Sequence, residues 1–246
     1  MTGVRAVRPG DILRTVLAVL AILPGILAGL GAWLRHRDRR RALNRALDIW
    51  GRWGTGAAGI ELLVRGERHL ALRPAVFCIN HQSGIDPILV CALLKRDFVG
   101  VAKAEIRRNP YLGPAFGFVG TVFVDREDHE GAIRSLEEAA QALHGGVGIA
   151  IAPEGTRSSG EAVGSFKKGG FRIAQAAGVP VVPIVIHDAG QILPRGGFVM
   201  RSGAVHVTVL EPRETADWSR STLDEGIAEI ETAYRATLER GWHAET

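Results

Sequence analysis

Residues 75–87 read Ala75-Val-Phe-Cys-Ile-Asn-His-Gln-Ser-Gly-Ile-Asp-Pro87, and this stretch determines how the rest of the chain is interpreted. Its apolar half, Val76 to Ile79, is short and rich in β-favouring residues, which predicts a buried strand. The polar residues and Gly84 that follow indicate a turn. Asp86-Pro87 then predicts a helix start, with Asp86 as N-cap and proline at the first helical position. His81 therefore follows a strand, and Asp86 begins a helix.

The spacing of His81 and Asp86 decides whether they can cooperate. On one regular helix, five residues would place the side chains about 140° apart. A strand-to-helix turn between them lets the two side chains fold back and meet. A carboxylate beside an imidazole fixes one tautomer, so that the other ring nitrogen can accept a proton. Since this spacing also arises by chance, a solvated histidine in a loop is the alternative, and the surrounding sequence must decide.

Composition indicates one globular domain with an N-terminal appendage. The chain has 246 residues, of which 46% are hydrophobic, enough for a sizeable core. Its net charge of +4 permits anionic partners such as phosphate or acidic lipid. Aromatic residues make up only 6% and are not interleaved with basic runs, which argues against a nucleic-acid partner. Cys78 and Cys91 lie in apolar segments without metal-ligand spacing, so we expect buried thiols, a reducing compartment and no metal site.

Residues 1–57 predict a membrane-anchoring helical region. Thr15 to Leu34 is an uncharged, mostly apolar stretch of 20 residues, the length of a membrane span. Pro24-Gly25 lies in its middle and predicts a break. Arginines flank both ends, so charge gives no orientation. We expect a helical hairpin that dips into one leaflet with both ends cytoplasmic; a single full span and a buried soluble helix are the alternatives. Residues 42–57 continue with helical apolar spacing and aromatics suited to a membrane interface.

Residues 58–246 alternate between strand and helix patterns, which predicts one α/β domain. Continuously apolar strands indicate a mixed, largely buried sheet flanked by helices. The expected strands are Ile60–Val64, Ala75–Ile79, Val99–Ala102, Thr121–Val124, Gly148–Ala152, Val181–Ile186 and Val205–Leu210. The expected helices are Pro87–Leu94, Glu130–Leu143, Phe166–Ala177 and Leu223–Arg240.

Two further expected strands end in charged residues. One runs from Phe118 to Arg126, and the other ends in Pro153-Glu-Gly-Thr-Arg157. Ligands of α/β sheets gather outside the carboxyl ends of the strands, so His81, Arg126 and Arg157 are expected in one crevice. Two arginines suit bidentate phosphate recognition, and Lys103 adds a point charge after another strand. For each of these residues taken alone, a surface salt bridge is the alternative.

Four sequence blocks occur in order between about residues 59 and 190. They read Asn80-His-Gln-Ser-Gly-Ile-Asp86, Gly120-Thr-Val-Phe-Val-Asp-Arg126, Pro153-Glu-Gly-Thr-Arg157 and Val179-Pro-Val-Val-Pro183-Ile-Val. Together they resemble the glycerolipid acyltransferases of the 1-acylglycerol-3-phosphate acyltransferase type. Lys103-Ala-Glu105 and Phe166-Lys-Lys-Gly169 are also similar to that family. One departure is Ala152, where an aromatic residue commonly precedes Pro-Glu-Gly.

The resemblance implies transfer of a fatty acyl group from acyl-CoA to the free hydroxyl of 1-acylglycerol-3-phosphate (lysophosphatidic acid). The product would be phosphatidic acid, an intermediate of phospholipid biosynthesis. His81 would be the general base and Asp86 would orient it. No cofactor is implied beyond acyl-CoA as co-substrate, and acyl-carrier protein is the alternative donor. The expected location is the cytoplasmic face of the cell membrane, among the lipids that hold acceptor and product.

The resemblance also assigns the remaining site residues. The acceptor phosphate is expected at Lys103, Arg126, Glu154, Gly155, Thr156 and Arg157, with Glu154 and Thr156 shaping the loop. Gly84 and nearby backbone N–H groups are candidate oxyanion donors. Pro183 and its apolar strand are expected to line the acyl or carrier side.

Three other functions stay open at this point. The first is the same chemistry on glycerol-3-phosphate or on another lysophospholipid. The second is a lipid hydrolase in which the His81–Asp86 pair activates Ser83 or water, although Ser83 lacks the Gly-x-Ser-x-Gly pattern. The third is a non-enzymatic membrane-surface protein, which leaves the polar strand ends unexplained.

Overall fold

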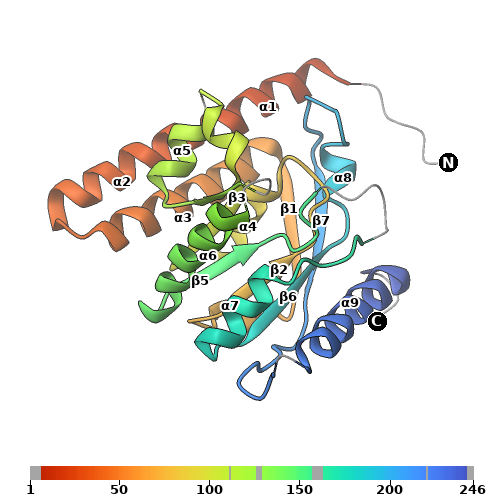
Figure 1. Cartoon of the computed structure of the whole chain (residues 1–246). Coiled ribbons are helices and arrows are strands. Elements are labelled where there is room, and N and C mark those ends of the chain that lie inside the picture. Colours follow the sequence, from red (N-terminus) through yellow and green to blue (C-terminus); the bar gives the residue numbers. More distant parts are fainter. Residues whose placement is uncertain (1–6, 111, 126–128, 157–162, 220, 243–246) are drawn as a thin grey trace.

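A mixed sheet lies at the centre of the computed structural model, which describes residues 7–110, 112–125, 129–156, 163–219 and 221–242 (Figure 1). Within these residues the sheet has seven strands in the order β1-β7-β6-β2-β5-β3-β4. Their bounds are β1 Ile60–Arg65, β2 Val76–Ile79, β3 Phe98–Lys103, β4 Val122–Val124, β5 Gly148–Ile151, β6 Val181–Ile186 and β7 Gly203–Val209. The expected α/β fold and all of the expected strands are confirmed.

Strand direction brings the polar strand ends together. Neighbouring strands are parallel except for the antiparallel pair β6 and β7. The central strand β2 aligns Cys78 with Ile151 of β5 and with Pro183 of β6. The carboxyl ends of β2, β3, β4, β5 and β6 therefore lie along one edge of the sheet, where α/β proteins place their ligands.

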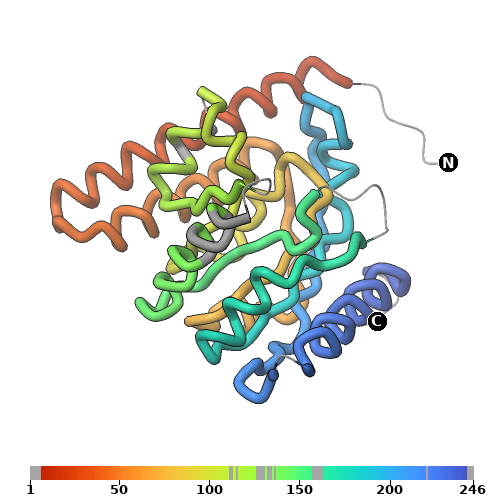
Figure 2. The backbone as a smooth tube through the Cα atoms, in the orientation of Figure 1, coloured from red at the N-terminus to blue at the C-terminus, as the bar shows by residue number. Residues whose placement is uncertain are grey.

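Both faces of the sheet are buried. In β2, Phe77 and Ile79 pack into one hydrophobic core, and Val76 and Cys78 pack into the other, as the alternation of a strand requires. The first core includes α3 (Arg39–Ala58) and α4 (Asp86–Leu94), and the second includes α6 (His129–His144), α7 (Gly169–Ala177) and α9 (Leu223–Arg240). The chain trace in Figure 2 places α9 at the opposite end of the molecule from the N-terminal helices. Burial on both faces explains the uninterrupted apolar strands.

Helix bounds differ from expectation mainly at α7. It begins at Gly169 and not at Phe166, because the preceding backbone bonds elsewhere: Phe166 N donates to Glu231 Oε1 (2.6 Å) and Lys167 N to Pro153 O (2.8 Å). Short elements that the sequence did not predict are η1 (Glu67–Ala71), η2 (Ala104–Arg108), α5 (Leu112–Phe118) and α8 (Ala189–Ile192).

The N-terminal region is a helical hairpin, but its turn is not where the sequence placed it. Helices α1 (Pro9–Leu20) and α2 (Ile22–His36) are separated only by Ala21, whose backbone stays in the right-handed helical region, so they form one long rod (Figure 1). The chain does not fold back at Pro24-Gly25, as the expected hairpin requires: the helix is interrupted only at Ala21, and Pro24 lies in the first turn of α2, where no intrahelical N–H is needed. The chain turns at Arg37-Asp38, and Asp38 caps α3 by accepting from Arg41 N (3.1 Å).

Small residues let α2 and α3 pack closely. A Cβ added at Gly25 would lie 2.8 Å from Ala46 O, and one added at Gly29 would lie 2.8 Å from Ala42 O. Since both neighbours are backbone oxygens of a helix, they cannot move aside cheaply. The two glycines are therefore required by the contact between the helices.

Both ends of the rod are attached to the rest of the molecule. At the α1 end, Met200 N donates to Thr15 Oγ1 (2.7 Å). Beyond the α2 end, Arg40 Nε in α3 donates to Asp97 Oδ1 (2.5 Å), just before β3. Burial alone would raise the pKa of Asp97, but hydrogen bonds from Arg40 and Asn44 hold it below its usual value. The hairpin is therefore fixed to the sheet domain at two separate points.

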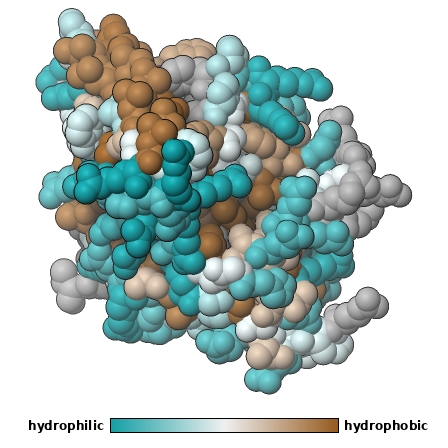
Figure 3. Space-filling view, turned by 90° about the vertical axis from the view of Figure 1, so that its left-hand side faces the viewer, coloured by the Kyte–Doolittle hydropathy of each residue, from teal (hydrophilic) through white to brown (hydrophobic). Residues whose placement is uncertain are grey.

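The outward face of the rod is apolar. Taken together, the helices over Pro9–His36 are long and apolar enough to cross a membrane. Only 28% of their most apolar 18-residue segment is buried. Its exposed large side chains are Ile12, Leu13, Val16, Leu17, Val19, Leu20, Leu23, Leu27, Leu30, Trp33 and Leu34. Figure 3, which looks from the α2 side, shows hydrophobic residues gathered at the upper edge above a hydrophilic surface.

We expect Gly29→Ala to lower the free energy of unfolding by about 1–3 kcal/mol, because the new methyl group collides with the α3 backbone. Gly31→Ala is the matched control: a Cβ there meets nothing within 4 Å, so better helix propensity makes it neutral or stabilising by up to about 1 kcal/mol. Chemical denaturation in mild detergent measures both. Equal stability of the two variants would contradict the close packing of α2 on α3.

Candidate active site

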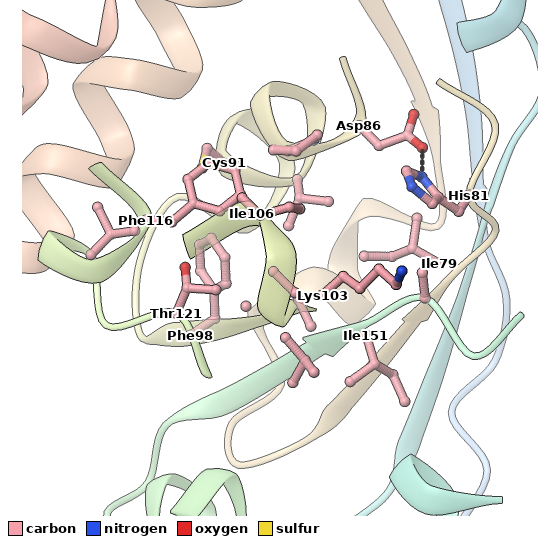
Figure 4. A pocket seen from close by; sticks show the side chains of 18 of the residues that line it. Ile79, His81, Asp86, Cys91, Phe98, Lys103, Ile106, Phe116, Thr121 and Ile151 are labelled. Carbon is pink, nitrogen blue, oxygen red and sulfur yellow. Dashed lines mark hydrogen bonds and ion pairs between the residues drawn. The ribbon is translucent and has the colours of Figure 1, made fainter. Parts of the chain in front are cut away.

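His81 and Asp86 form a hydrogen-bonded pair at the end of β2. His81 Nδ1 lies 2.6 Å from Asp86 Oδ2 (Figure 4), as the sequence predicted. The Asp86 side chain is 7% exposed and the His81 side chain 31%, so a buried carboxylate holds a partly accessible ring. A carboxylate at this position favours hydrogen on Nδ1 and leaves the Nε2 lone pair as the base. The geometry suits proton abstraction from a substrate at the accessible side of the ring.

Asp86 is not the N-cap that the sequence predicted. Asp86 is itself the first residue of α4, and Ile85 precedes it with a right-handed helical backbone. The carboxylate turns back toward the preceding loop, where Oδ2 also accepts Gln82 N (2.9 Å) and Ser83 N (3.0 Å). Its negative charge at the first turn of a helix is favourable as well. One oxygen therefore shapes the turn and orients the imidazole.

Two buried polar side chains fix the backbone on either side of this turn. Asn80 donates to Ile186 O (2.8 Å) and accepts from Ile186 N (2.7 Å), which ties the end of β2 to the end of β6. Glu154 accepts His81 N (2.9 Å) and Gly164 N (2.9 Å). These contacts give Glu154 a positioning role, while the phosphate role expected of it stays a prediction. The sequence predicts no separate role for Asn80, and the only signal in the sequence is a polar residue directly after a buried strand.

A cavity of about 490 Å³ opens beside His81. His81 and Asp86 lie at one end in Figure 4, and Phe98 and Phe116 lie at the other. Most of the wall is apolar and comes from α3, α4, α5, β3 and β5. It is formed by Leu47, Trp50, Ile79, Asn80, His81, Asp86, Pro87, Val90, Cys91, Phe98, Gly100, Val101, Ala102, Lys103, Ile106, Phe116, Val119, Thr121, Ala150, Ile151, Ala152, Gly155 and Thr156. The size and the apolar wall are typical of a pocket for a hydrophobic ligand.

Lys103, Gly155 and Thr156 line the same cavity as His81, while the expected convergence of Arg126 and Arg157 with His81 stays a prediction. Lys103 forms an ion pair with Glu105, and its side chain is 50% exposed. Gly155 has a φ of +76°, a conformation that favours glycine, where the chain turns after β5. Arg126 and Arg157 lie outside the described residues.

Gly84 and Pro183 do not line the cavity. Gly84 is exposed in the turn before α4, so its expected oxyanion role stays a prediction. Pro183 is buried within β6, aligned with Cys78. There the hydroxyl of Tyr234 donates to Cys78 O and accepts from Ile184 N (3.0 Å), next to the position where proline lacks an N–H. The acyl-side role expected of Pro183 has no support from these contacts.

Ser83 is placed unfavourably for the hydrolase alternative. Its side chain is fully buried, and Oγ donates to Leu193 O (2.7 Å). Asp86 Oδ2 meanwhile accepts both the imidazole and the Ser83 backbone N–H. The Ser83 hydroxyl therefore stabilises the loop, and its position does not suit a nucleophile activated by His81.

Known proteins are similar to this chain. The family model described as Acyltransferase matches residues 61–187. The 1-acyl-sn-glycerol-3-phosphate acyltransferase of Limnanthes douglasii is 31% identical over 73% of this chain and 64% of its own length. The enzyme of the same name from Pseudomonas aeruginosa is 31% identical over 62% of this chain and 59% of its own length. The chain thus spans about two thirds or less of these relatives.

A solved structure is similar over nearly the whole chain. It is the crystal structure of the 1-acyl-sn-glycerophosphate (LPA) acyltransferase PlsC from Thermotoga maritima, with a TM-score of 0.76 and 27% identity. The similarity covers 94% of this chain and 97% of that one. Because the family model spans just over half of the sequence and contains both His81 and Asp86, the chain belongs to the acyltransferase family.

Proposed function

We propose that this protein transfers a fatty acyl group from acyl-CoA to the free hydroxyl of 1-acylglycerol-3-phosphate, giving phosphatidic acid. The observation that carries the proposal is the His81–Asp86 pair at the end of a long apolar cavity. A base alone fits many reactions, but a base at the mouth of an apolar cavity fits a substrate with a hydrocarbon tail. The relatives whose names state this activity support the choice of acceptor.

The chemistry follows from the position of His81. Its Nε2 takes the proton of the acceptor hydroxyl while that oxygen attacks the thioester carbonyl. The new C–O bond forms, the C–S bond breaks, and the leaving thiolate takes the proton from the imidazolium. Asp86 Oδ2 stabilises the imidazolium during this exchange. A carrier thioester is already activated, so the reaction needs no acyl-enzyme intermediate and no cofactor beyond the co-substrate.

The cavity would hold the acyl chain of the donor. Its far wall includes the side chains of Trp50 and Phe116, whose ring centroids are 5.8 Å apart. Burying each methylene group of a hydrocarbon chain contributes about 0.8 kcal/mol, so a chain in this cavity is bound firmly and positioned at its carbonyl end. Acyl-CoA and acyl-carrier protein present the same thioester, and acyl-carrier protein remains the alternative donor.

The acceptor phosphate would bind at the carboxyl edge of the sheet. Lys103 and Thr156 line the cavity near His81 on the ends of β3 and β5. In the sequence, Arg126 and Arg157 follow the ends of β4 and β5, two of the strands whose carboxyl ends form this edge. Guanidinium groups bind phosphate in bidentate fashion, which suits both arginines for this role.

The N-terminal rod would lie in one leaflet, on the cytoplasmic face, without crossing the membrane. Both of its ends are attached to the same sheet domain, at Thr15 and beyond α2 at Arg40, and a spanning helix would separate these ends by a bilayer. Its outward apolar face would enter the hydrocarbon, and the arginines after residue 34 would lie among anionic headgroups.

We expect His81→Ala to lower the rate of acyl transfer by about 10²–10⁴, because the general base is lost. Asp86→Asn should also lower it, though less, since the imidazolium is no longer stabilised. The exposed His144→Ala is the matched control and should keep full activity. Release of CoA thiol from acyl-CoA in the presence of lysophosphatidic acid measures the rate, and thermal unfolding checks the fold. Near-normal turnover of folded His81→Ala would refute the mechanism.

Neutralising either Arg126 or Arg157 should lower kcat/KM for lysophosphatidic acid about ten- to hundred-fold, because a hydrogen bond to a charged group contributes about 1.5–3 kcal/mol. The apparent KM for acyl-CoA should change less, and Arg→Lys should recover only part of the loss. The exposed Arg172→Ala on α7 is the control. Steady-state kinetics with one substrate varied at a time decides; equal losses for donor and acceptor would place the phosphate elsewhere.

Cysteine labels can test the orientation of the rod, because both native cysteines are buried. We expect Val7→Cys and Arg39→Cys to react equally with a membrane-impermeant maleimide added outside sealed vesicles that carry the protein. This result follows if both ends of the rod stay on one side of the bilayer. Labelling of one site only, with the other protected until the vesicles are opened by detergent, would show a full span.

A further inference from the structure

The loop between α8 and β7 exposes an aromatic residue at its tip. Phe198 is 89% exposed, the highest value among the large hydrophobic residues that the structure describes. It follows Gly196-Gly197, and Gly196 has a φ of +78°. Single exposed apolar residues are common and carry no meaning by themselves. The surroundings of Phe198 must therefore show whether it has a partner.

Hydrogen bonds attach this loop directly to α1. Met200 N donates to Thr15 Oγ1 (2.7 Å), and Arg14 Nη1 donates to Ser202 Oγ (3.3 Å). Phe198 is only two residues from the first contact. In Figure 1 the loop rises from α8 to the level of α1. The aromatic tip is therefore adjacent to the rod that we place in the membrane.

The neighbouring surface of α1 is apolar as well. Ile12 and Leu13, on the exposed side of α1, are 52% and 60% exposed. Arg195, three residues before Phe198, is also exposed. An exposed aromatic residue in a loop bonded to an apolar helix, with an exposed arginine three residues away in the sequence, is the composition of an element at the lipid–water boundary. In water this apolar surface would stay exposed, whereas a bilayer would cover it together with α1.

We propose that the loop of residues 193–202 is a second membrane contact, in which Phe198 inserts at the boundary of headgroups and acyl chains and Arg195 binds lipid phosphate. The proposal rests on the proposed placement of α1 and α2 in one leaflet. With only the rod in the bilayer, the protein could roll about the rod axis. A second contact beside the rod fixes that rotation.

The loop also connects the membrane to the catalytic turn. Ser83 lies two residues after His81, and its hydroxyl donates to Leu193 O (2.7 Å). Arg201 N donates to Ile192 O (2.8 Å), which closes the base of the loop. A tip held in the lipid surface therefore sets the height of the His81 turn above the bilayer, where the acceptor hydroxyl must arrive.

Phe198→Cys, labelled with an environment-sensitive fluorophore, tests insertion without relying on activity. The native cysteines are buried, so the label reports on one site. The control is Glu229→Cys, an exposed position on α9 at the far end of the molecule (Figure 2). On vesicles containing phosphatidylglycerol and shallow spin-labelled lipid, we expect a blue shift and at least twofold quenching at 198, and neither at 229.

Flotation of the same samples separates the possible failures. A label at 198 that stays in water while the protein floats with vesicles overturns this proposal and leaves the placement of the rod intact. A label that is shielded from water but insensitive to spin-labelled lipid assigns the tip to a protein partner and also overturns it. Loss of flotation altogether overturns the placement of the rod as well.

Two substitutions give the quantitative arm. Phe198→Ser should raise the lipid concentration that gives half-maximal vesicle binding three- to tenfold. Arg195→Gln should make vesicle binding less dependent on the fraction of anionic lipid. Neither should change transfer to a short-chain, water-soluble acceptor. Unchanged vesicle binding in both variants would show that the loop contributes nothing to the interface.

Discussion

The arrangement of the site depends on one carboxylate oxygen. Asp86 Oδ2 accepts the His81 imidazole and the backbone N–H groups of Gln82 and Ser83. Among the described residues, Asp86 Oδ1 has no hydrogen-bond partner, so the contacts of Oδ2 and the start of α4 must offset the burial of the charge. The same three bonds fold the turn and orient the imidazole, so the turn cannot change shape without moving the His81 ring. The geometry of the His81–Asp86 pair and the local fold are thus one constraint.

The sheet extends this constraint to segments that are distant in the sequence. Parallel pairing of β2 with β5 brings the loop after β5 beside His81, and Glu154 makes the connection by accepting the His81 backbone N–H. On the other side, Asn80 completes the pairing of β2 with β6 through Ile186. Both side chains are buried, so replacing either would leave backbone groups unsatisfied in the core. His81 is therefore held by its own turn and by both neighbouring strands.

The sequence predicted the features that depend on local pattern. Uninterrupted apolar runs identified the strands, and polar residues at their ends identified the edge of the sheet where His81 and Lys103 line one cavity. The errors came from partners that are distant in sequence. Pro24 looked like a break because its place in the first turn of α2 depends on where α1 ends. The positioning contacts of Glu154 were missed because its two backbone donors, one of them 73 residues away, are not visible in its local sequence, while its phosphate role stays a prediction. Pro183 was expected to line the acyl side of the site, and only the fold shows that it is buried within β6.

The position of α3 connects the N-terminal hairpin to the cavity. One face of α3 receives the glycines of α2 against Ala42 and Ala46, and another face places Leu47 and Trp50 in the wall of the cavity. A rigid helix shared by both contacts keeps the cavity at a fixed depth relative to the apolar rod. If the rod lies in a leaflet, a hydrocarbon chain can pass from lipid to cavity along apolar surface, without the cost of exposing it to water. The close packing of α2 on α3 then serves the reaction as much as it serves stability.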